Sequence, residues 1–280
     1  MRPALALLLC VAAIAKAAFA QALPAASGEH VHVALIAEQT ALVPGERTWV
    51  GLRLKHEPHW HTYWINPGDS GLPTKLAWQV PAGIKPGDIA WPAPQRFDVG
   101  GLYNFGYAGE IVLPVPVQVG TDARPGATVR LELEARWLVC REECVPGRKR
   151  LTLTLPVATH AGIDPRTRKA FAAAHAAQPV ASSWTGAARL DGDQVVVTLS
   201  GSELPAAESL DAFVVQPQLV GYAPPRVASR GDSLSLAFER SEYLAATPAT
   251  LDLVVVDGRP PNRHARSVTL PFAANPSAKP

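Results

Sequence analysis

The chain has 280 residues, of which 26 are lysine or arginine and 24 are aspartate or glutamate. This nearly neutral balance, without basic clusters, argues against nucleic acid and anionic membrane surfaces as partners. Beyond residue 20 there is no apolar run of about 18 residues, so we expect no membrane span in the sequence given.

Residues 1–20 have the pattern of a cleaved secretory signal peptide. Arg2 precedes an apolar run, and the segment ends in Ala18-Phe19-Ala20, so Gln21 is the expected start of the mature protein. A lipoprotein signal at Cys10 is the less favoured interpretation, because the small residue expected before a lipidated cysteine is missing. Export would place the remaining cysteines in an oxidising compartment.

Residues from about 29 to 158 predict an antiparallel β-sandwich. Apolar and charged residues alternate over 129–137, and the alternation returns over 151–157. A period of two is typical of half-buried strands. Further strands are expected at 30–37, 48–55, 75–80 and 111–119.

One helix is expected in a connector at residues 159–182. Asp164 is a suitable N-cap and Pro165 suits the first helical position. The alanine-rich stretch from Arg166 to Ala177 continues the helix, and Pro179 ends it.

Residues 183–273 predict a second all-β domain, followed by a tail at 274–280. The expected strands lie at 187–190, 194–199, 212–216, 233–239, 250–256 and 267–272. Arg230-Gly231-Asp232 is expected to be a hairpin turn, and we interpret the domain as a spacer or docking module. The predicted fold class is therefore all-β, with two sandwiches joined by a short helical connector.

Cys140 and Cys144 are the only cysteines outside the predicted signal peptide, and three residues separate them. A disulfide closing so small a loop contributes only about 2 kcal/mol of stability, which favours a redox role. A structural disulfide that braces a hairpin is the alternative. The charges nearby do not decide between these roles, because basic and acidic side chains flank the pair: Arg141, Arg148, Lys149, Glu142 and Glu143.

Three nearby histidines, at positions 56, 59 and 61, raise the question of a metal site. His59 and His61 would share a strand face and make a plausible pair of ligands. The surrounding Trp60, Tyr63 and Trp64 favour a packed aromatic patch instead, so we expect no metal.

Gly68-Asp69-Ser70-Gly71 is similar to the nucleophile segment of chymotrypsin-like proteases, but the matching histidine segment is missing. A tight turn is the favoured interpretation. In that turn Asp69 and Ser70 would bond to the local backbone, and the glycines would have positive φ.

An ordered series of segments resembles the periplasmic N-terminal region of the DsbD family. The branch with the strongest likeness is the one that includes the suppressor-of-copper-sensitivity protein ScsB. The resemblance is strong over about residues 30–158. Its segments are His61–Gly71, Trp91–Phe97, Tyr103–Tyr107, Leu113–Pro116 and Trp137–Pro146.

This resemblance implies an immunoglobulin-like sandwich that takes part in thiol-disulfide interchange in the periplasm. Electrons would come from a membrane-embedded reductase and pass to thioredoxin-like partners, without an organic cofactor, metal, nucleic acid or small-molecule substrate. The chain would thus act as a component of a protein-disulfide reductase. A non-catalytic periplasmic binding module with a structural disulfide, perhaps linked to copper tolerance, is the alternative.

The resemblance also implies roles for individual residues. Cys144 would form the mixed disulfide with a partner, and Cys140 would resolve it. Trp137 and Pro146 would frame the site. A cap loop would shield the pair, formed by Tyr103, Asn104, Phe105, Gly106 and Tyr107.

Two features depart from the family pattern. Better-studied members space the cysteines more widely, so their redox potential does not transfer to this chain. The sequence given also lacks the family's transmembrane electron carrier and terminal thioredoxin domain. We expect either the soluble portion of a longer protein or a stand-alone protein that uses a separate reductase.

Overall fold

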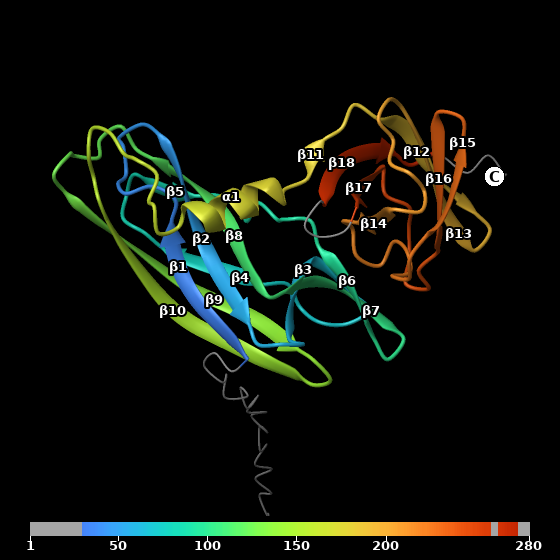
Figure 1. Cartoon of the computed structure of the whole chain (residues 1–280), viewed down its shortest axis with the longest axis horizontal. Helices are drawn as coiled ribbons and strands as arrows, with labels where there is room; N and C mark the ends of the chain where they lie inside the picture. The colour runs from blue at the N-terminus through green and yellow to red at the C-terminus, as the bar shows by residue number, and fades with distance from the viewer. Residues whose placement is uncertain (1–29, 259–262, 274–280) are drawn as a thin grey trace, which may run out of the picture.

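The computed structural model describes residues 30–258 and 263–273, which form two β-sandwiches with a helix between them (Figure 1). The predicted signal peptide at 1–20 and the predicted tail at 274–280 lie outside the described residues. No helix in the described part of the chain has both the length and the apolar character needed to cross a membrane. The predicted architecture of two immunoglobulin-like sandwiches with a helical connector is confirmed.

The N-terminal sandwich consists of two antiparallel sheets. The first has the strand order β1-β2-β8-β5, with β1 at Val31–Ala37, β2 at Arg47–His56, β5 at Ile84–Pro86 and β8 at Glu110–Val119. The second has the order β10-β9-β3-β7-β6, and β4 also pairs with β9. Its strands are β3 at His61–Gly68, β4 at Lys75–Gln79, β6 at Gln95–Val99, β7 at Leu102–Ala108, β9 at Thr128–Cys140 and β10 at Cys144–Pro156.

The β9–β10 hairpin has the alternation that the sequence predicts. Odd-numbered residues from Leu131 to Val139 point into the core and are buried, whereas even-numbered residues from Glu132 to Leu138 are at least partly exposed. The two strands stay in register along their whole length. Because the hairpin is this regular, its turn holds both cysteines at one end of the sheet.

The helix α1, at Arg168–Ala176, packs on the first sandwich. Phe171 is fully buried and lies against Gly51 of β2, where an added Cβ would stand 3.2 Å from the Phe171 ring. The helix begins three residues later than predicted, and its N-cap is Thr167. Asp164 is not the cap because its carboxylate bonds within the preceding turn.

The C-terminal sandwich has sheets of order β11-β18-β17-β14 and β12-β13-β16-β15. The strands of the first are β11 at Val180–Ala181, β14 at Leu210–Val214, β17 at Thr250–Asp257 and β18 at His264–Pro271. Those of the second are β12 at Thr185–Asp191, β13 at Gln194–Ser200, β15 at Arg226–Arg230 and β16 at Ser233–Glu239. The hairpin turn predicted at Arg230-Gly231-Asp232 is confirmed between β15 and β16, and Gly231 has a φ of +56°.

The two sandwiches meet through a continuous apolar core. Phe213 of β14 lies edge-on to Trp64 of β3 and to Phe105 of β7, with ring centroids 6.2 and 5.0 Å apart. Arg96 of β6 lies against the rings of Phe105 and Phe213. Its guanidinium donates to the two carboxylate oxygens of Asp211 at 3.3 and 2.7 Å. The second sandwich is therefore attached directly to strands β3, β6 and β7.

Replacing Arg96 with alanine should weaken this junction. The Arg96 side chain is 8% exposed and that of Asp211 is 33% exposed. Removing Arg96 leaves the charge of the Asp211 carboxylate without a partner. We therefore expect Arg96→Ala to lower the free energy of unfolding, measured by urea denaturation, by about 3 kcal/mol. Arg266→Ala is the control, because it breaks a more exposed pair with Glu203 and should cost less than about 1 kcal/mol. Equal losses in the two variants would contradict a structural role for the junction.

Candidate functional site

A disulfide joins the end of β9 to the start of β10. Cys140 is the last residue of β9 and Cys144 the first of β10, and their Cα atoms are 4.1 Å apart. Side chains alternate along a strand, so Cys140 lies on the opposite face from the inward-pointing Val139. In spite of this outward direction Cys140 is only 2% exposed, whereas Cys144 is exposed. One cysteine is thus shielded and the other accessible.

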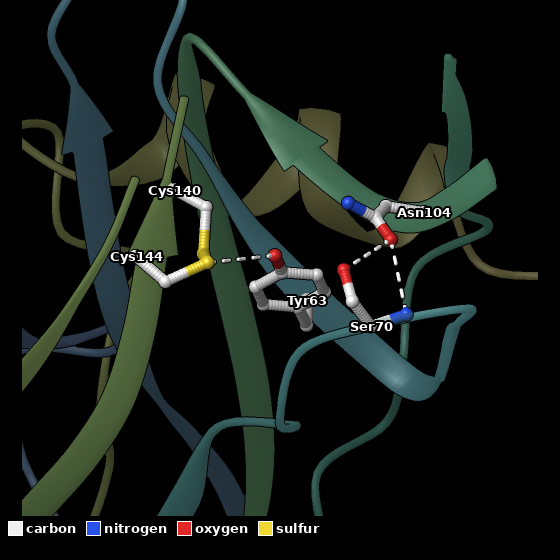
Figure 2. Close-up of a disulfide and its surroundings, with 5 residues drawn as sticks. All are labelled: Tyr63, Ser70, Asn104, Cys140 and Cys144. Atoms are coloured by element: carbon white, nitrogen blue, oxygen red, sulfur yellow. Dashed lines mark hydrogen bonds between the residues drawn. A yellow bond between two sulfur atoms is a disulfide. The ribbon is translucent and has the colours of Figure 1, made fainter. Parts of the chain in front are cut away.

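A row of side chains continues from the disulfide across the sheet. Cys144, Cys140 and His61 occupy opposite positions on β10, β9 and β3, and they therefore share the outer face. Tyr63 lies on the same face, with its ring centroid 5.2 Å from that of His61. Its hydroxyl is 3.6 Å from Cys144 Sγ (Figure 2). Strand β3 thereby places a phenol and an imidazole beside the disulfide.

The segment that follows β3, residues 68–72, folds back against Tyr63. A Cβ on Gly71 would stand 2.2 Å from the Tyr63 ring, so only glycine allows this close approach. Gly68 and Gly71 have φ values of +90° and +99°. The predicted turn with positive φ at its glycines is confirmed.

The same segment is tied to β7. Ser70 donates from its backbone N–H and its hydroxyl to Asn104 Oδ1, at 3.3 and 2.9 Å (Figure 2). Asp69 Oδ2 accepts a hydrogen bond from the Tyr103 N–H at 2.7 Å. The prediction that Asp69 and Ser70 bond to the local backbone is therefore wrong, because both side chains reach across to the neighbouring strand.

The five residues predicted to form a cap loop lie within strand β7: Tyr103, Asn104, Phe105, Gly106 and Tyr107. The prediction of a loop is wrong, since the alternating aromatic residues have the period of a strand. Phe105 is 3% exposed, and its ring packs on Phe213 and Tyr222 of the second sandwich. Gly106 allows close approach to β3 and is no pivot, because an added Cβ would stand 1.9 Å from the Thr62 carbonyl oxygen.

The remaining aromatic and frame residues lie on different faces of the sheet. Tyr107 is buried, and its hydroxyl donates to a backbone carbonyl at 2.7 Å. Trp137 points inward and covers Gly147, so it lies behind the sheet and not beside the disulfide. Pro146 is exposed and shares a face with Cys144, two residues away.

The three histidines near the site have separate environments. His56 Nδ1 lies 2.7 Å from the Gly109 carbonyl oxygen, and its Nε2 lies 3.0 Å from Thr62 Oγ1. His59 is exposed and precedes β3 with a φ of +71°, so the prediction that it shares a strand face with His61 is wrong. Within residues 30–258 and 263–273, no group of three or more His, Cys, Asp or Glu residues is arranged to hold a metal ion.

His61 is a buried histidine with an unpaired nitrogen. It is 3% exposed and stacks on Phe97 with ring centroids 4.6 Å apart. Its Nε2 has no hydrogen-bond partner among the described residues. Burial, with a smaller effect from the charge of His56, lowers the pKa of His61 from 6.5 to about 4. The imidazole is therefore neutral at neutral pH.

The charges that flank the disulfide in sequence are partly compensated in the structure. Arg148 and Arg136 both form ion pairs with Glu134. Hydrogen bonds from these arginines lower the pKa of Glu134 to about 2. Arg141, in the turn between the cysteines, lies with its guanidinium carbon 5.6 Å from the centroid of the Trp60 ring. Because Arg148 shares the single Glu134 carboxylate with Arg136 and Arg150, its charge is only partly compensated.

The N-terminal sandwich matches a known protein family. Residues 32–156 match the family described as the N-terminal domain of the thiol:disulfide interchange protein DsbD. Residues 32–156 form a DsbD-type domain. The resemblance predicted from the sequence motifs is confirmed for this part of the chain.

A solved structure extends the likeness in fold beyond the DsbD-type domain. The N-terminal periplasmic domain of ScsB from Proteus mirabilis has 21% sequence identity and a TM-score of 0.64, with coverage of 88% of this chain and 95% of that one. The major pilin subunit BcpA of Bacillus cereus matches with 6% identity and a TM-score of 0.27, covering 88% of this chain and 68% of that one. The TM-score of 0.27 for BcpA is too low to support a structural argument. No curated protein matches the chain.

Sequence reasoning missed the neighbours that strand pairing brings to the DsbD-type disulfide. Tyr63 was assigned only to an aromatic patch and His61 was weighed as a metal ligand, although their spacing of two residues puts them on one strand face. Phe97 and Ser70 lie in segments that the sequence singles out, but no signal placed them near the disulfide, because β6 and the segment after β3 reach the site through long-range pairing.

Replacing Tyr63 with phenylalanine should slow reactions of reduced Cys144. A hydrogen bond from the Tyr63 hydroxyl stabilises the Cys144 thiolate, so removing the hydroxyl should make the reduced Cys144 thiol less acidic. The greater nucleophilicity of the more basic thiolate offsets part of this loss, which leaves alkylation at neutral pH about threefold slower. Mass spectrometry of Cys144 alkylation measures the rate. Tyr243→Phe, at a residue that is 68% exposed, is the control, and equal rates in both variants would exclude a role for the Tyr63 hydroxyl.

The protein should lose stability as the pH falls from about 6.5 to about 4. The folded-state pKa of His61 is lowered to about 4 and that of His56 is also lowered, so the unfolded chain binds more protons in this range. Above about pH 6.5 His61 is neutral in both the folded and the unfolded chain, so it does not lower the free energy of unfolding. Between about pH 6.5 and pH 4 it takes up a proton mainly in the unfolded chain, which should lower the free energy of unfolding by about 3 kcal/mol. Urea denaturation at several pH values measures this loss. His61→Phe should lessen the pH dependence by about that amount, and an unchanged dependence would contradict the account.

Proposed function

We propose that the chain relays reducing equivalents by thiol-disulfide interchange, from a membrane-embedded thiol reductase to thioredoxin-like proteins of the periplasm. The DsbD-type domain and its Cys140–Cys144 disulfide support an interchange module. The observation that carries the proposal is the unequal burial of the pair, since a partner can approach exposed Cys144 while Cys140 stays shielded.

The chemistry requires only the two sulfurs. In the reduced protein the Cys144 thiolate attacks one sulfur of a partner disulfide, which forms a mixed disulfide and releases the other partner sulfur as a thiolate. Cys140 then attacks Cys144 Sγ, the Cys140–Cys144 bond forms, and the second partner sulfur leaves. The pair is oxidised by two electrons and the partner disulfide is reduced by two. A dithiol of the reductase restores the pair by the reverse sequence.

Further observations support the proposed compartment and partners. The matched domain of ScsB is described as periplasmic, and residues 1–20 here have the pattern of an export signal. Thioredoxin-like proteins carry accessible disulfides that exchange with an exposed thiolate. In this proposal the second sandwich, residues 183–273, supports strands β3, β6 and β7.

Reduction of the disulfide should leave the protein folded. A five-residue loop contributes only about 2 kcal/mol, against a typical stability of about 5–15 kcal/mol. We expect a mild dithiol to reduce the pair while the near-ultraviolet circular dichroism stays the same. Unfolding on reduction at room temperature would favour the structural disulfide, and with it the non-catalytic binding module.

Single cysteine variants should distinguish the two sulfurs. Cys140→Ser leaves Cys144 able to attack but removes the resolving thiol, so it should accumulate a mixed disulfide with an oxidised thioredoxin-like protein. Cys144→Ser leaves only the buried Cys140, so this variant should accumulate little mixed disulfide. Non-reducing electrophoresis measures both products. Equal trapping by the two variants would contradict the assigned roles.

A further inference from the structure

His61 carries a buried polar atom for which the disulfide-bonded protein provides no partner. Its Nε2 lacks a hydrogen bond among the described residues, and the residue is 3% exposed. A buried polar group without a partner costs free energy, so such groups are rare in folded proteins. The DsbD-type fold and the proposed interchange do not by themselves account for a histidine here.

The position of His61 suggests where its partner arises. His61 lies directly opposite Cys140 in the β3–β9 pair, and opposite residues share a face with Cβ atoms about 4.5–5.5 Å apart. The imidazole stacks on Phe97, at 4.6 Å between ring centroids, and meets the Tyr63 ring edge-on at 5.2 Å. These two rings fix the imidazole on the sheet face that it shares with Cys140. A disulfide sulfur has no proton to share, but a Cys140 thiol has one.

The titratable groups around His61 are few. Tyr63 lies on its own strand, His56 comes from β2, and the two cysteines come from β9 and β10. Strands β6 and β7 present the uncharged Phe97 and Ala108 to it.

The carboxylates that follow Phe97 and Ala108 in sequence, and Glu57 and Asp69 on either side of His61, are engaged elsewhere. Glu57 pairs with His30 at 2.8 Å, and Asp69 accepts a hydrogen bond from the Tyr103 N–H at 2.7 Å. Asp98 accepts a hydrogen bond from the Gly101 N–H at 2.9 Å, and Glu110 pairs with Arg53 at 2.8 Å. The pKa of His61, lowered to about 4 by burial and by His56, keeps the imidazole neutral while the disulfide is intact. The imidazole is therefore unprotonated on one ring nitrogen, and it becomes more basic only when a negative charge forms beside it.

We propose that His61 accepts the proton of Cys140 when Cys140 resolves the mixed disulfide, an inference that rests on the proposed interchange function. The Cys140 S–H bond breaks and its proton moves to His61 Nε2. The Cys140 sulfur attacks Cys144 Sγ, the intramolecular disulfide forms, and the partner sulfur leaves as a thiolate. The imidazolium then gives its proton to this thiolate or to water, so that protons and electrons balance.

The shielding of Cys140 is the reason why such a group would speed the step. Burial raises the pKa of a thiol, and only the thiolate attacks a disulfide. An imidazole next to the thiol offsets this burial, because thiolate and imidazolium stabilise each other when they form together. Cys144 is exposed and already has the Tyr63 hydroxyl at 3.6 Å. Two residues on the outer face of β3 thus serve one sulfur each, Tyr63 for Cys144 and His61 for Cys140.

The test follows the two steps separately. Reduced protein is mixed in a stopped-flow instrument with an aromatic disulfide whose released thiolate is coloured. The attack by Cys144 gives a first release, and resolution by Cys140 gives a second. Both rates are measured between about pH 5 and about pH 9, which spans the ordinary pKa values of histidine and cysteine.

The variants His61→Gln and His61→Phe separate proton transfer from packing. Glutamine hydrogen-bonds but takes no proton in this pH range, and phenylalanine keeps the stack on Phe97 without a nitrogen. A positioned acid or base typically contributes about 10²–10⁴-fold, so both variants should slow the second release at neutral pH by at least about tenfold and move its pH profile upward. The first release should be little changed. His175→Gln, on α1, is the control and should behave as the parent does.

A second measurement needs no substitution. Nuclear magnetic resonance titration of His61 in the oxidised and reduced parent should show a higher pKa in the reduced protein, where a thiolate can form beside it. Equal pKa values in the two states, or parental second-release rates in both variants, would overturn the role of His61. Absence of a second release from the parent itself would instead overturn the proposed interchange function.

Discussion

The pairing of β3 between β9 and β7 is the constraint on which the site depends. Its outer face carries His61 and Tyr63 to the two cysteines at the turn of the β9–β10 hairpin. Its inner face carries Trp64 and Asn66 to the second sandwich, where the Asn66 amide donates to the Val214 carbonyl oxygen at 2.8 Å. One strand therefore connects the redox residues to the junction between the sandwiches.

This arrangement explains how a short disulfide is exposed on one side only. Cys140 lies on the outer face of the sheet, where solvent would ordinarily reach it, yet it is 2% exposed. The β3 side chains and the stacked Phe97 occupy that face, and the segment at 68–72 is held against Tyr63. Groups built on paired strands are held more rigidly than groups on a loop. The covering of the site is thus part of the sheet and of the turn tied to it.

The parts of the fold that depend on local pattern were predictable from the sequence. The β9–β10 hairpin follows from strict alternation, the α1 helix from its alanine-rich segment, and the β15–β16 turn from its central glycine. The neighbours of the disulfide were not predictable in this way. The family resemblance implied a loop at residues 103–107, whereas these residues form strand β7 and Gly106 is required for close approach to β3. Which strand lies beside Cys140 is decided by long-range pairing, and a local pattern does not contain that information.

The most direct test of the central claim is the electron balance between the reduced protein and an oxidised thioredoxin-like protein. The two are mixed in equal amounts, quenched with acid, alkylated and weighed intact by mass spectrometry. The account predicts that one partner disulfide is reduced for each Cys140–Cys144 pair that becomes oxidised. A partner that stays oxidised while both cysteines remain free would contradict it.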